Sequence, residues 1–210
     1  MDAVRDDEAG LTHFYHVYAD GDWRRPVEEH LDALEQHGLA AALDAFGVGI
    51  VGSPENRSRA FEVVNDRLPV DHLVEADVGW EQLTIRLLLA EGRGKVLYAH
   101  TKTAVNYSDM HDQWRRSMEF FNVVRWQRCV ELLDEFDTVG CHKIEHEVPN
   151  PLLGFWGGNY WWANHDWLLT VPELSDESRY HAEAWIGYGL GKRFDLNPGW
   201  PDPRLFVTEW

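Results

Sequence analysis

The stretch that decides the fold is Lys95–Thr103, KVLYAHTKT, in which an apolar β-type run is followed by histidine, threonine and lysine. In an open α/β sheet, ligands bind outside the carboxyl ends of the strands, so polar residues directly after a buried strand are natural ligand contacts. The stretch therefore predicts a binding site at His100, Thr101 and Lys102. The alternative is that these residues only cap an ordinary strand.

Composition and charge narrow the class of protein. The chain has 210 residues, of which 44% are hydrophobic, and this is enough for one sizeable core, so we expect a single domain over residues 1–210. The formal net charge of −17 would repel nucleic acid and anionic lipid, so neither is an expected partner. Cys129 and Cys141 are too few for a disulfide framework, and no apolar run approaches the roughly 18 residues of a membrane span. We therefore expect a cytoplasmic protein without a membrane span.

The first half of the chain alternates strand and helix patterns. Four short apolar or β-branched runs are bounded by Gly, Pro and Asp and predict strands at residues 11–19, 47–52, 72–76 and 96–99. Between them, Pro26 and Pro54 stand where first-turn prolines belong, and Leu83 and Leu87 lie one turn apart in a helix over 80–91. This alternation predicts an α/β fold with a mostly parallel central sheet that helices cover on both faces.

The second half is organised differently. Apolar residues at three-, four- and eight-residue steps indicate one long helix or two abutting ones from about 112 to 136. The remaining expected segments are a strand at 138–141, a Gly- and Pro-rich loop at 149–158, a strand at 159–163, a helix at 179–186 and an irregular tail over 187–210. His142 and His146, with Glu145 and Glu147, lack the order of a zinc protease motif, so we interpret them as structural or surface residues.

Six short motifs in register give the chain a resemblance to a known family. It resembles the bacterial and viral capsular or lipopolysaccharide-type glycosyltransferases of the GT-A fold. The matching segments are Tyr15–Tyr18 with Trp23, Val27 and Leu34–Leu39; Val96–Thr103; Trp114–Phe121; Phe136–His142; Gly158–Ala163; and Arg179–Ile186. One departure is Thr103, which stands where the family usually has glycine. The resemblance covers almost the whole chain and implies a nucleotide-sugar-binding half over 1–103 and an acceptor-side half over 104–210.

The resemblance implies transfer of a sugar from a nucleotide sugar to a carbohydrate acceptor, such as a surface polysaccharide or a glycoprotein glycan. The leaving diphosphate then needs positive charge. Most GT-A enzymes hold a divalent metal there with an Asp-x-Asp motif after the fourth strand, where this chain has His100, Thr101 and Lys102. Lys102 can supply the charge itself, and His100 can donate to a phosphate or ligate a metal, so the need for Mn²⁺ or Mg²⁺ stays open. Asp20-Gly21-Asp22 follows the first strand instead, and we interpret it as a turn.

The donor's base and ribose are expected over the ends of the first three strands. This position nominates Tyr18, Ala19, Gly52 and Asp77, with Tyr18 able to stack on the base and Asp77 able to hold a ribose hydroxyl. Arg115 is a further candidate for the diphosphate. The alternatives are a core aromatic for Tyr18, a surface carboxylate for Asp77 and a solvated charge for Arg115.

The acceptor contacts are expected around Asn159, whose amide suits sugar hydroxyls, and Trp161 or Trp162, whose indole can stack on a pyranose. In a regular strand the two tryptophans point to opposite faces, so at most one faces the ligand. Glu183 matches the acidic residue of the last motif and is the candidate base of an inverting reaction, with Asp166 as the alternative.

Two other functions stay open at this point. One is a non-catalytic carbohydrate-binding relative that kept the tryptophan-rich groove but lost the metal motif. The other is a DNA-modifying sugar transferase, which the net charge of −17 disfavours.

Overall fold

The computed structural model describes residues 10–102, 104, 108–145, 154–176 and 178–198. The helices and strands of the first half alternate in the predicted order. They are β1 (Leu11–Tyr18), α1 (Arg24–Gln36), a short 3-10 turn (Ala40–Ala42), β2 (Ala45–Val51), α2 (Pro54–Arg67), β3 (His72–Ala76), α3 (Gln82–Glu91) and β4 (Lys95–His100).

The second half begins with a broken helix. Its elements are α4 (Asp109–Glu119), a π-helical segment (Phe120–Val124), α5 (Trp126–Leu132), β5 (Thr138–Gly140), β6 (Lys143–Ile144), β7 (Phe155–Trp156), β8 (Trp161–Asn164), α6 (His165–Leu168), α7 (Arg179–Ala184), a 3-10 turn (Trp185–Tyr188) and β9 (Arg193–Asp195). Among the described residues, no helix is long and apolar enough to cross a bilayer.

The central sheet has seven strands in the order β3-β2-β1-β4-β8-β5-β9. β1 pairs in parallel with β2 and β4, and β3 pairs in parallel with β2. β8 runs antiparallel to both of its neighbours, β4 and β5, whereas β9 is parallel to β5. The predicted mostly parallel sheet is confirmed, and β8 is its one reversed strand.

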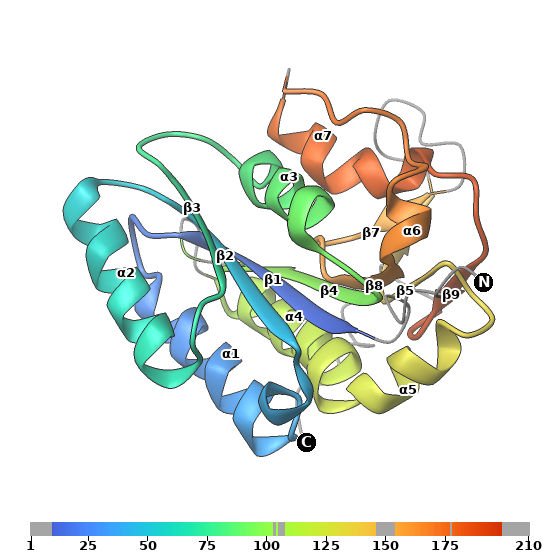
Figure 1. Ribbon diagram of the computed structural model, residues 1–210, viewed down its shortest axis with the longest axis horizontal. Coiled ribbons are helices and arrows are strands. Elements are labelled where there is room, and N and C mark those ends of the chain that lie inside the picture. Colours follow the sequence, from blue (N-terminus) through green and yellow to red (C-terminus); the bar gives the residue numbers. More distant parts are fainter. Residues whose placement is uncertain (1–9, 103, 105–107, 146–153, 177, 199–210) are drawn as a thin grey trace, which may run out of the picture.

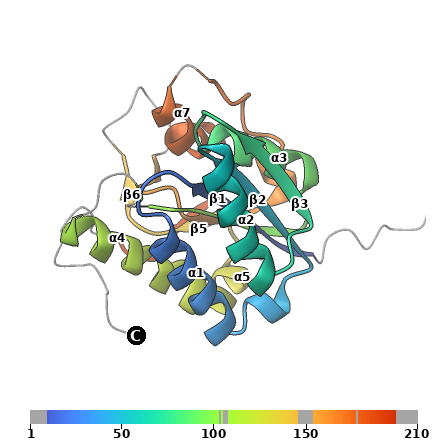
Figure 2. The ribbon, with the colours of Figure 1, turned by 90° about the vertical axis from the view of Figure 1, so that its left-hand side faces the viewer.

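Helices cover the sheet on both faces, as predicted. Figures 1 and 2 show α1, α4 and α5 on one side and α3 and α7 on the other. Each strand contributes side chains to both helical layers, because successive side chains of a strand point to opposite faces of the sheet. Tyr15 and Val17 of β1 pack in the cluster that includes α1, α2, α4 and α5, whereas Phe14 packs in the cluster of α3, α6 and α7. By the same rule His16 and His100 lie on the α3 and α7 side.

The helical stretch expected over 112–136 is confirmed in its second form, as two abutting helices, α4 and α5, which the π-helical segment joins. Two other expectations about the second half need correction. The tail after Gly187 is not wholly irregular, since β9 closes the edge of the sheet beside β5. Part of the expected 149–158 loop forms β7, which pairs with β6, while residues 149–153 lie outside the described residues.

Candidate functional site

A cavity of about 830 Å³ opens at the carboxyl ends of the parallel strands. Its floor is formed by His16 and Tyr18 of β1, Val51 of β2 and His100 of β4. One wall is the segment 77–81 between β3 and α3, and the other is the start of α7. The parallel strands thus place the cavity where the strand-end rule expects a ligand.

Six of the sequence-predicted residues line this cavity. They are Tyr18, Asp77, His100, Thr101, Lys102 and Glu183. Ala19 and Gly52 lie directly behind the lining, where their amides extend the ladder: Ala19 N donates to Val51 O (2.7 Å) and Gly52 N to Ala76 O (3.1 Å). The Asp77 side chain is largely exposed and is ion-paired with Arg57 (2.9 Å).

Thr101 fixes the backbone of the floor. Its amide donates to His16 O (2.9 Å), and its hydroxyl accepts a hydrogen bond from Tyr18 N (2.8 Å). The side chain thereby continues the pairing of β1 with β4 by one step beyond the last ladder bond. Thr101 is 5% exposed, and its two hydrogen bonds to β1 give it a structural role in the floor of the cavity.

Glu81 and His100 form a charged pair across the cavity. His100 Nδ1 lies 2.9 Å from Glu81 Oε1, and His100 Nε2 lies 2.7 Å from Gly158 O. A carbonyl oxygen only accepts, so Nε2 carries a hydrogen. Burial raises the pKa of Glu81, but the ion pair and hydrogen bond with His100 outweigh burial and hold this pKa well below its usual range. Glu81 is therefore a carboxylate, and both ring nitrogens of His100 face acceptors, Nδ1 the Glu81 carboxylate and Nε2 the Gly158 carbonyl.

The Gly158–Asn159 turn is held by three acidic or cationic side chains of the site. Gly158 N donates to Glu183 Oε1 (2.7 Å), Gly158 O accepts from His100, and Asn159 Nδ2 donates to Glu81 Oε2 (3.0 Å). Both residues have left-handed backbone angles, with φ of 85° at Gly158 and 55° at Asn159. Such a conformation is costly for asparagine and persists only where the surroundings determine it. The turn therefore fixes Glu183 relative to Glu81 and His100.

His16 completes the floor as a neutral ring. It pairs in register with His100 on the neighbouring strand, and its Nδ1 lies 2.8 Å from Thr84 Oγ1. Burial lowers the pKa of His16 to about 4, so the ring is uncharged at neutral pH.

Two cations of the lining have no carboxylate partner among the described residues. Lys102 Nζ lies 4.1 Å from the centroid of the Trp114 ring, and the Arg179 guanidinium lies 4.9 Å from the centroid of the Tyr180 ring. Aromatic faces attract cations without neutralising them. On a chain with a net charge of −17, two such cations in one cavity make it a candidate anion site.

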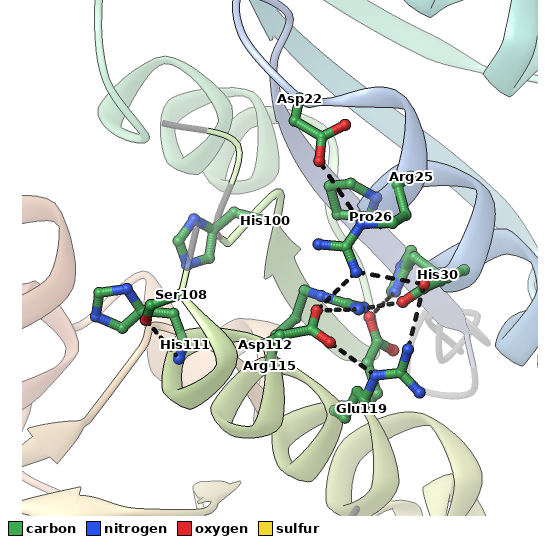
Figure 3. A network of polar contacts seen from close by, with 12 residues as sticks. Asp22, Arg25, Pro26, His30, His100, Ser108, His111, Asp112, Arg115 and Glu119 are labelled. Atoms are coloured by element: carbon green, nitrogen blue, oxygen red, sulfur yellow. Dashed lines mark hydrogen bonds and ion pairs between the residues drawn. The ribbon is translucent and has the colours of Figure 1, made fainter. Parts of the chain in front are cut away.

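Arg115 lies outside the cavity lining. It is 1% exposed and ion-paired with Glu29 and with Asp112 (3.0 Å), and Arg25 joins the same cluster through Asp112 (2.9 Å). Figure 3 shows this cluster between α1 and α4, with His100 apart from it. The structure therefore places Arg115 in an interhelical ion-pair network.

A buried polar chain runs beneath the cavity floor. His13 Nε2 lies 2.8 Å from His30 Nε2, and His30 Nδ1 lies 2.8 Å from Glu119 Oε1. The Tyr160 hydroxyl is 3.2 Å from the same carboxylate oxygen and donates to His100 O (2.7 Å). This chain secures the end of β4 from the side opposite the cavity.

Neither tryptophan of β8 faces the cavity. Trp161 and Trp162 are fully buried on opposite faces of the sheet, and their indole N–H groups donate to Asn159 Oδ1 and Asn122 O, both at 2.8 Å. Asn159 is itself 1% exposed, and its amide is used by Glu81 and Trp161. Asp166 is exposed on α6 and does not line the cavity. β8 is a central strand, and that position explains why helices cover both of its faces.

Sequence reasoning missed Trp80, Glu81 and Tyr180, all of which line the cavity. Trp80 and Tyr180 are 48% and 53% exposed, unlike the buried tryptophans of β8. Residues that directly follow a predicted strand are natural ligand contacts, so the segment after β3 could have indicated Trp80 and Glu81.

Among the described residues, no group of three or more His, Cys, Asp and Glu side chains is arranged to hold a metal ion. Both ring nitrogens of His100 are engaged in hydrogen bonds. Asp20 Oδ1 accepts from Ser53 N, Ser53 Oγ and Asn56 Nδ2, which lowers the pKa of Asp20 and ties the bend after β1 to α2.

Solved structures resemble this fold at low sequence identity. The 4-diphosphocytidyl-2C-methyl-D-erythritol synthase of Anaerococcus prevotii matches with a TM-score of 0.52 and 8% identity, over 97% of this chain and 94% of that one. Weaker likenesses are residues 1–349 of Staphylococcus aureus TarS (TM-score 0.48, 13% identity, covering 90% of this chain and 58% of that one) and a Pyrobaculum calidifontis mannosyltransferase solved with GDP-Man and Mn²⁺ (0.47, 15%, 88% and 54%). The fold is GT-A-like.

The chain spans little more than half the length of the TarS and mannosyltransferase chains that it matches. No protein-family model matches the sequence, and no curated protein sequence matches it. The likeness to solved structures therefore concerns the fold alone.

Proposed function

We propose that this chain is a glycosyltransferase that moves a sugar from a nucleotide-sugar donor to a carbohydrate acceptor, such as a surface polysaccharide or a glycoprotein glycan. The observation that carries the proposal is the pair of cations without carboxylate partners, Lys102 and Arg179, in an 830 Å³ cavity at the strand ends. Two positive charges match the two negative charges of a nucleoside-diphosphate sugar. A carbohydrate-binding module would have no need to concentrate cations in an otherwise acidic protein.

The cavity offers a place for each part of the donor. The nucleoside lies over the ends of β1 to β3, with Tyr18 against the base and Asp77 near the ribose. The diphosphate lies between Lys102, which leaves the end of β4, and Arg179, which begins α7. The sugar then lies toward Glu183.

Glu183 is the proposed base of an inverting transfer. Its Oε1 accepts from Gly158 N, and Oε2 has no hydrogen bond to any residue that the structure describes. Oε2 takes the proton of the acceptor hydroxyl as that oxygen bonds to the anomeric carbon, and the bond from this carbon to the phosphate oxygen breaks with its electrons going to the diphosphate. Asp166 lies outside the cavity and has no part in this scheme.

The charge on the leaving diphosphate is offset by Lys102 and Arg179, so transfer in this scheme routes no step through a divalent metal. A guanidinium and an ammonium placed where negative charge develops act electrostatically in the same way as other preorganised cations. Transfer is therefore expected to survive EDTA.

A thermal-shift panel of UDP, GDP, CMP and dTDP sugars, each with Mn²⁺ or EDTA, tests donor binding. A donor at 100 times its dissociation constant stabilises the native state by about 2.7 kcal/mol, which raises the Tm by roughly 5–10 °C. Lys102→Ala is expected to lose this shift, whereas the control Lys192→Ala, at an exposed position outside the cavity, is expected to keep it.

Slow hydrolysis of the binding donor by water separates an enzyme from a binding module. Release of the nucleoside diphosphate supports glycosyl transfer. Binding without turnover would leave a carbohydrate-binding relative, and release of pyrophosphate from a nucleoside triphosphate and a sugar phosphate would assign nucleotidyl transfer instead. Retention of duplex DNA at low salt would point to a DNA-modifying transferase.

A further inference from the structure

Two aromatic rings stand open at the mouth of the cavity. Trp80 is 48% exposed and Tyr180 is 53% exposed, and both line the cavity. Among the tryptophans in the described part of the chain, Trp80 alone is exposed. Leaving an indole half in water forgoes hydrophobic stabilisation, so an exposed ring in a cavity indicates a surface that a ligand covers.

The backbones that carry the two rings are fixed to one another. Gln82, two residues after Trp80, is 3% exposed, and its amide donates to Ser178 O (2.8 Å) and Ser175 O (3.2 Å). Ser178 caps α7 by accepting a hydrogen bond from Tyr180 N (3.2 Å). Glu81, which follows Trp80 directly, is held by His100 and Asn159. The two rings are therefore presented from a preorganised frame, which lowers the entropy cost of binding.

The position of Tyr180 relates this surface to the proposed base. Tyr180 and Glu183 are three residues apart on α7, so they share a helix face with Cβ atoms about 5–6 Å apart. This spacing is of the order of the width of one pyranose ring. A sugar that covers Tyr180 with its apolar face therefore directs a hydroxyl toward Glu183.

Charge restricts what kind of sugar this is. Lys102 and Arg179 are assigned to the diphosphate, and the carboxylates of Asp20, Asp77 and Glu183 remain around the lining. A carboxylate or phosphate on the acceptor would add to this negative charge on a protein of net charge −17.

We propose that the acceptor is an uncharged pyranoside whose apolar face stacks on Trp80 and Tyr180, in the place that the sequence had given to Trp161 and Trp162. This assignment rests on the proposed glycosyl transfer and names the acceptor class of the same site. Trp80 and Tyr180 bind the acceptor, and Glu183 receives its proton.

The test compares methyl glucoside, galactoside and mannoside with the corresponding methyl uronides. Binding to the full chain is measured by saturation-transfer NMR and titration, with a saturating nucleoside diphosphate present. Transfer kinetics are measured for Trp80→Ala, Tyr180→Ala and Trp80→Phe, with Leu169→Ala as the matched control. Leu169 is also exposed (58%) but lies outside the cavity.

The expected result is binding of at least one neutral glycoside and of no uronide. The acceptor KM should rise roughly tenfold in Trp80→Ala and in Tyr180→Ala, recover in large part in Trp80→Phe, and stay unchanged in Leu169→Ala. A change confined to kcat would indicate a structural role and overturn the assignment. Equal or better binding of uronides, or an unchanged KM in Trp80→Ala, would overturn it as well.

Failure of this inference can be told from failure of the proposed function. If the unaltered protein binds and hydrolyses a nucleotide sugar but ignores neutral glycosides, the acceptor class alone is wrong. If no nucleotide sugar stabilises the protein, the proposed function is wrong, whatever the glycosides do.

Discussion

The charged pair of Glu81 and His100 makes a sharp prediction about stability. Their side chains are 20% and 11% exposed, and the two atoms are 2.9 Å apart, which gives an attraction of about 6 kcal/mol at an effective dielectric constant of about 20. Desolvation offsets part of this attraction. Removing Glu81 also leaves its two hydrogen-bonding partners, His100 Nδ1 and Asn159 Nδ2, without an acceptor, at about 1–3 kcal/mol for each group or roughly 2–6 kcal/mol together. Glu81→Ala is therefore expected to lower the free energy of unfolding by that amount.

Glu81→Gln is the matched variant, because it can keep every hydrogen bond. A neutral His100 still donates from Nε2 to Gly158 O, its Nδ1 accepts from the glutamine amide, and the glutamine oxygen accepts from Asn159 Nδ2. The expected cost is about 1 kcal/mol, the difference between charged and neutral hydrogen bonds.

The assay is urea unfolding at pH 7, followed by tryptophan fluorescence and by circular dichroism. A Glu81→Ala protein within about 0.5 kcal/mol of the unaltered one would show that the pair contributes nothing and would refute the reasoning. Equal losses in the two variants would show that the charge, and not the connected hydrogen bonds, holds the turn.

Other predictions concern pH, the turn and the base. Burial lowers the pKa of His16 and of His142 to about 4, whereas the same side chains in the unfolded chain take up protons below about pH 6.5. The free energy of unfolding should therefore fall by roughly 3 kcal/mol per histidine as the pH is lowered from 6.5 to 4. A free energy of unfolding in urea that stays constant from pH 7 to 5 would contradict this. Gly158→Ala combines a φ of 85° with a Cβ 2.5 Å from the sulfur of Met118, so it should lower the free energy of unfolding by about 2 kcal/mol or more. Gly38 also has a positive φ but open space around it, so Gly38→Ala should lower it by only about 1 kcal/mol. Equal urea midpoints for the two variants would disprove the clash. Glu183→Gln still accepts from Gly158 N, so it should keep the donor's thermal shift and lose transfer, and full activity would mean that another group is the base.

The sequence predicted the first half of the fold well because the information there is local. β1, β2 and β4 are runs rich in apolar, aromatic or β-branched residues, and they are bounded by turn-forming residues. Alternate side chains of β1 and of β4 pack on opposite helical layers. β9 was missed because three residues in a Gly- and Pro-rich segment carry no local strand signal. It exists only because β5 offers an unpaired edge.

The sequence predicted those site residues that directly follow a strand. It could not predict those whose exposure depends on how the helices pack on the sheet. His100, Thr101 and Lys102 follow β4 directly, so the strand-end rule placed them in the lining. Trp161 and Trp162 were expected at the acceptor, but alternation says only that they face opposite ways. It does not say that both faces of β8 are covered. Tertiary structure alone decides which aromatic residues stay uncovered, and it left Trp80 and Tyr180 open.

The single reversed strand, β8, has a consequence for how this cavity is assembled. In a wholly parallel sheet only the exits of strands reach the ligand edge, whereas here the entrance of β8 meets the exit of β4, and His100 touches Gly158, which lies 58 residues later. The turn that enters β8 therefore reaches the cavity edge from the opposite direction, and its Gly158 links the end of β4 to Glu183 of α7. This part of the cavity edge needs no crossover connection to be placed there.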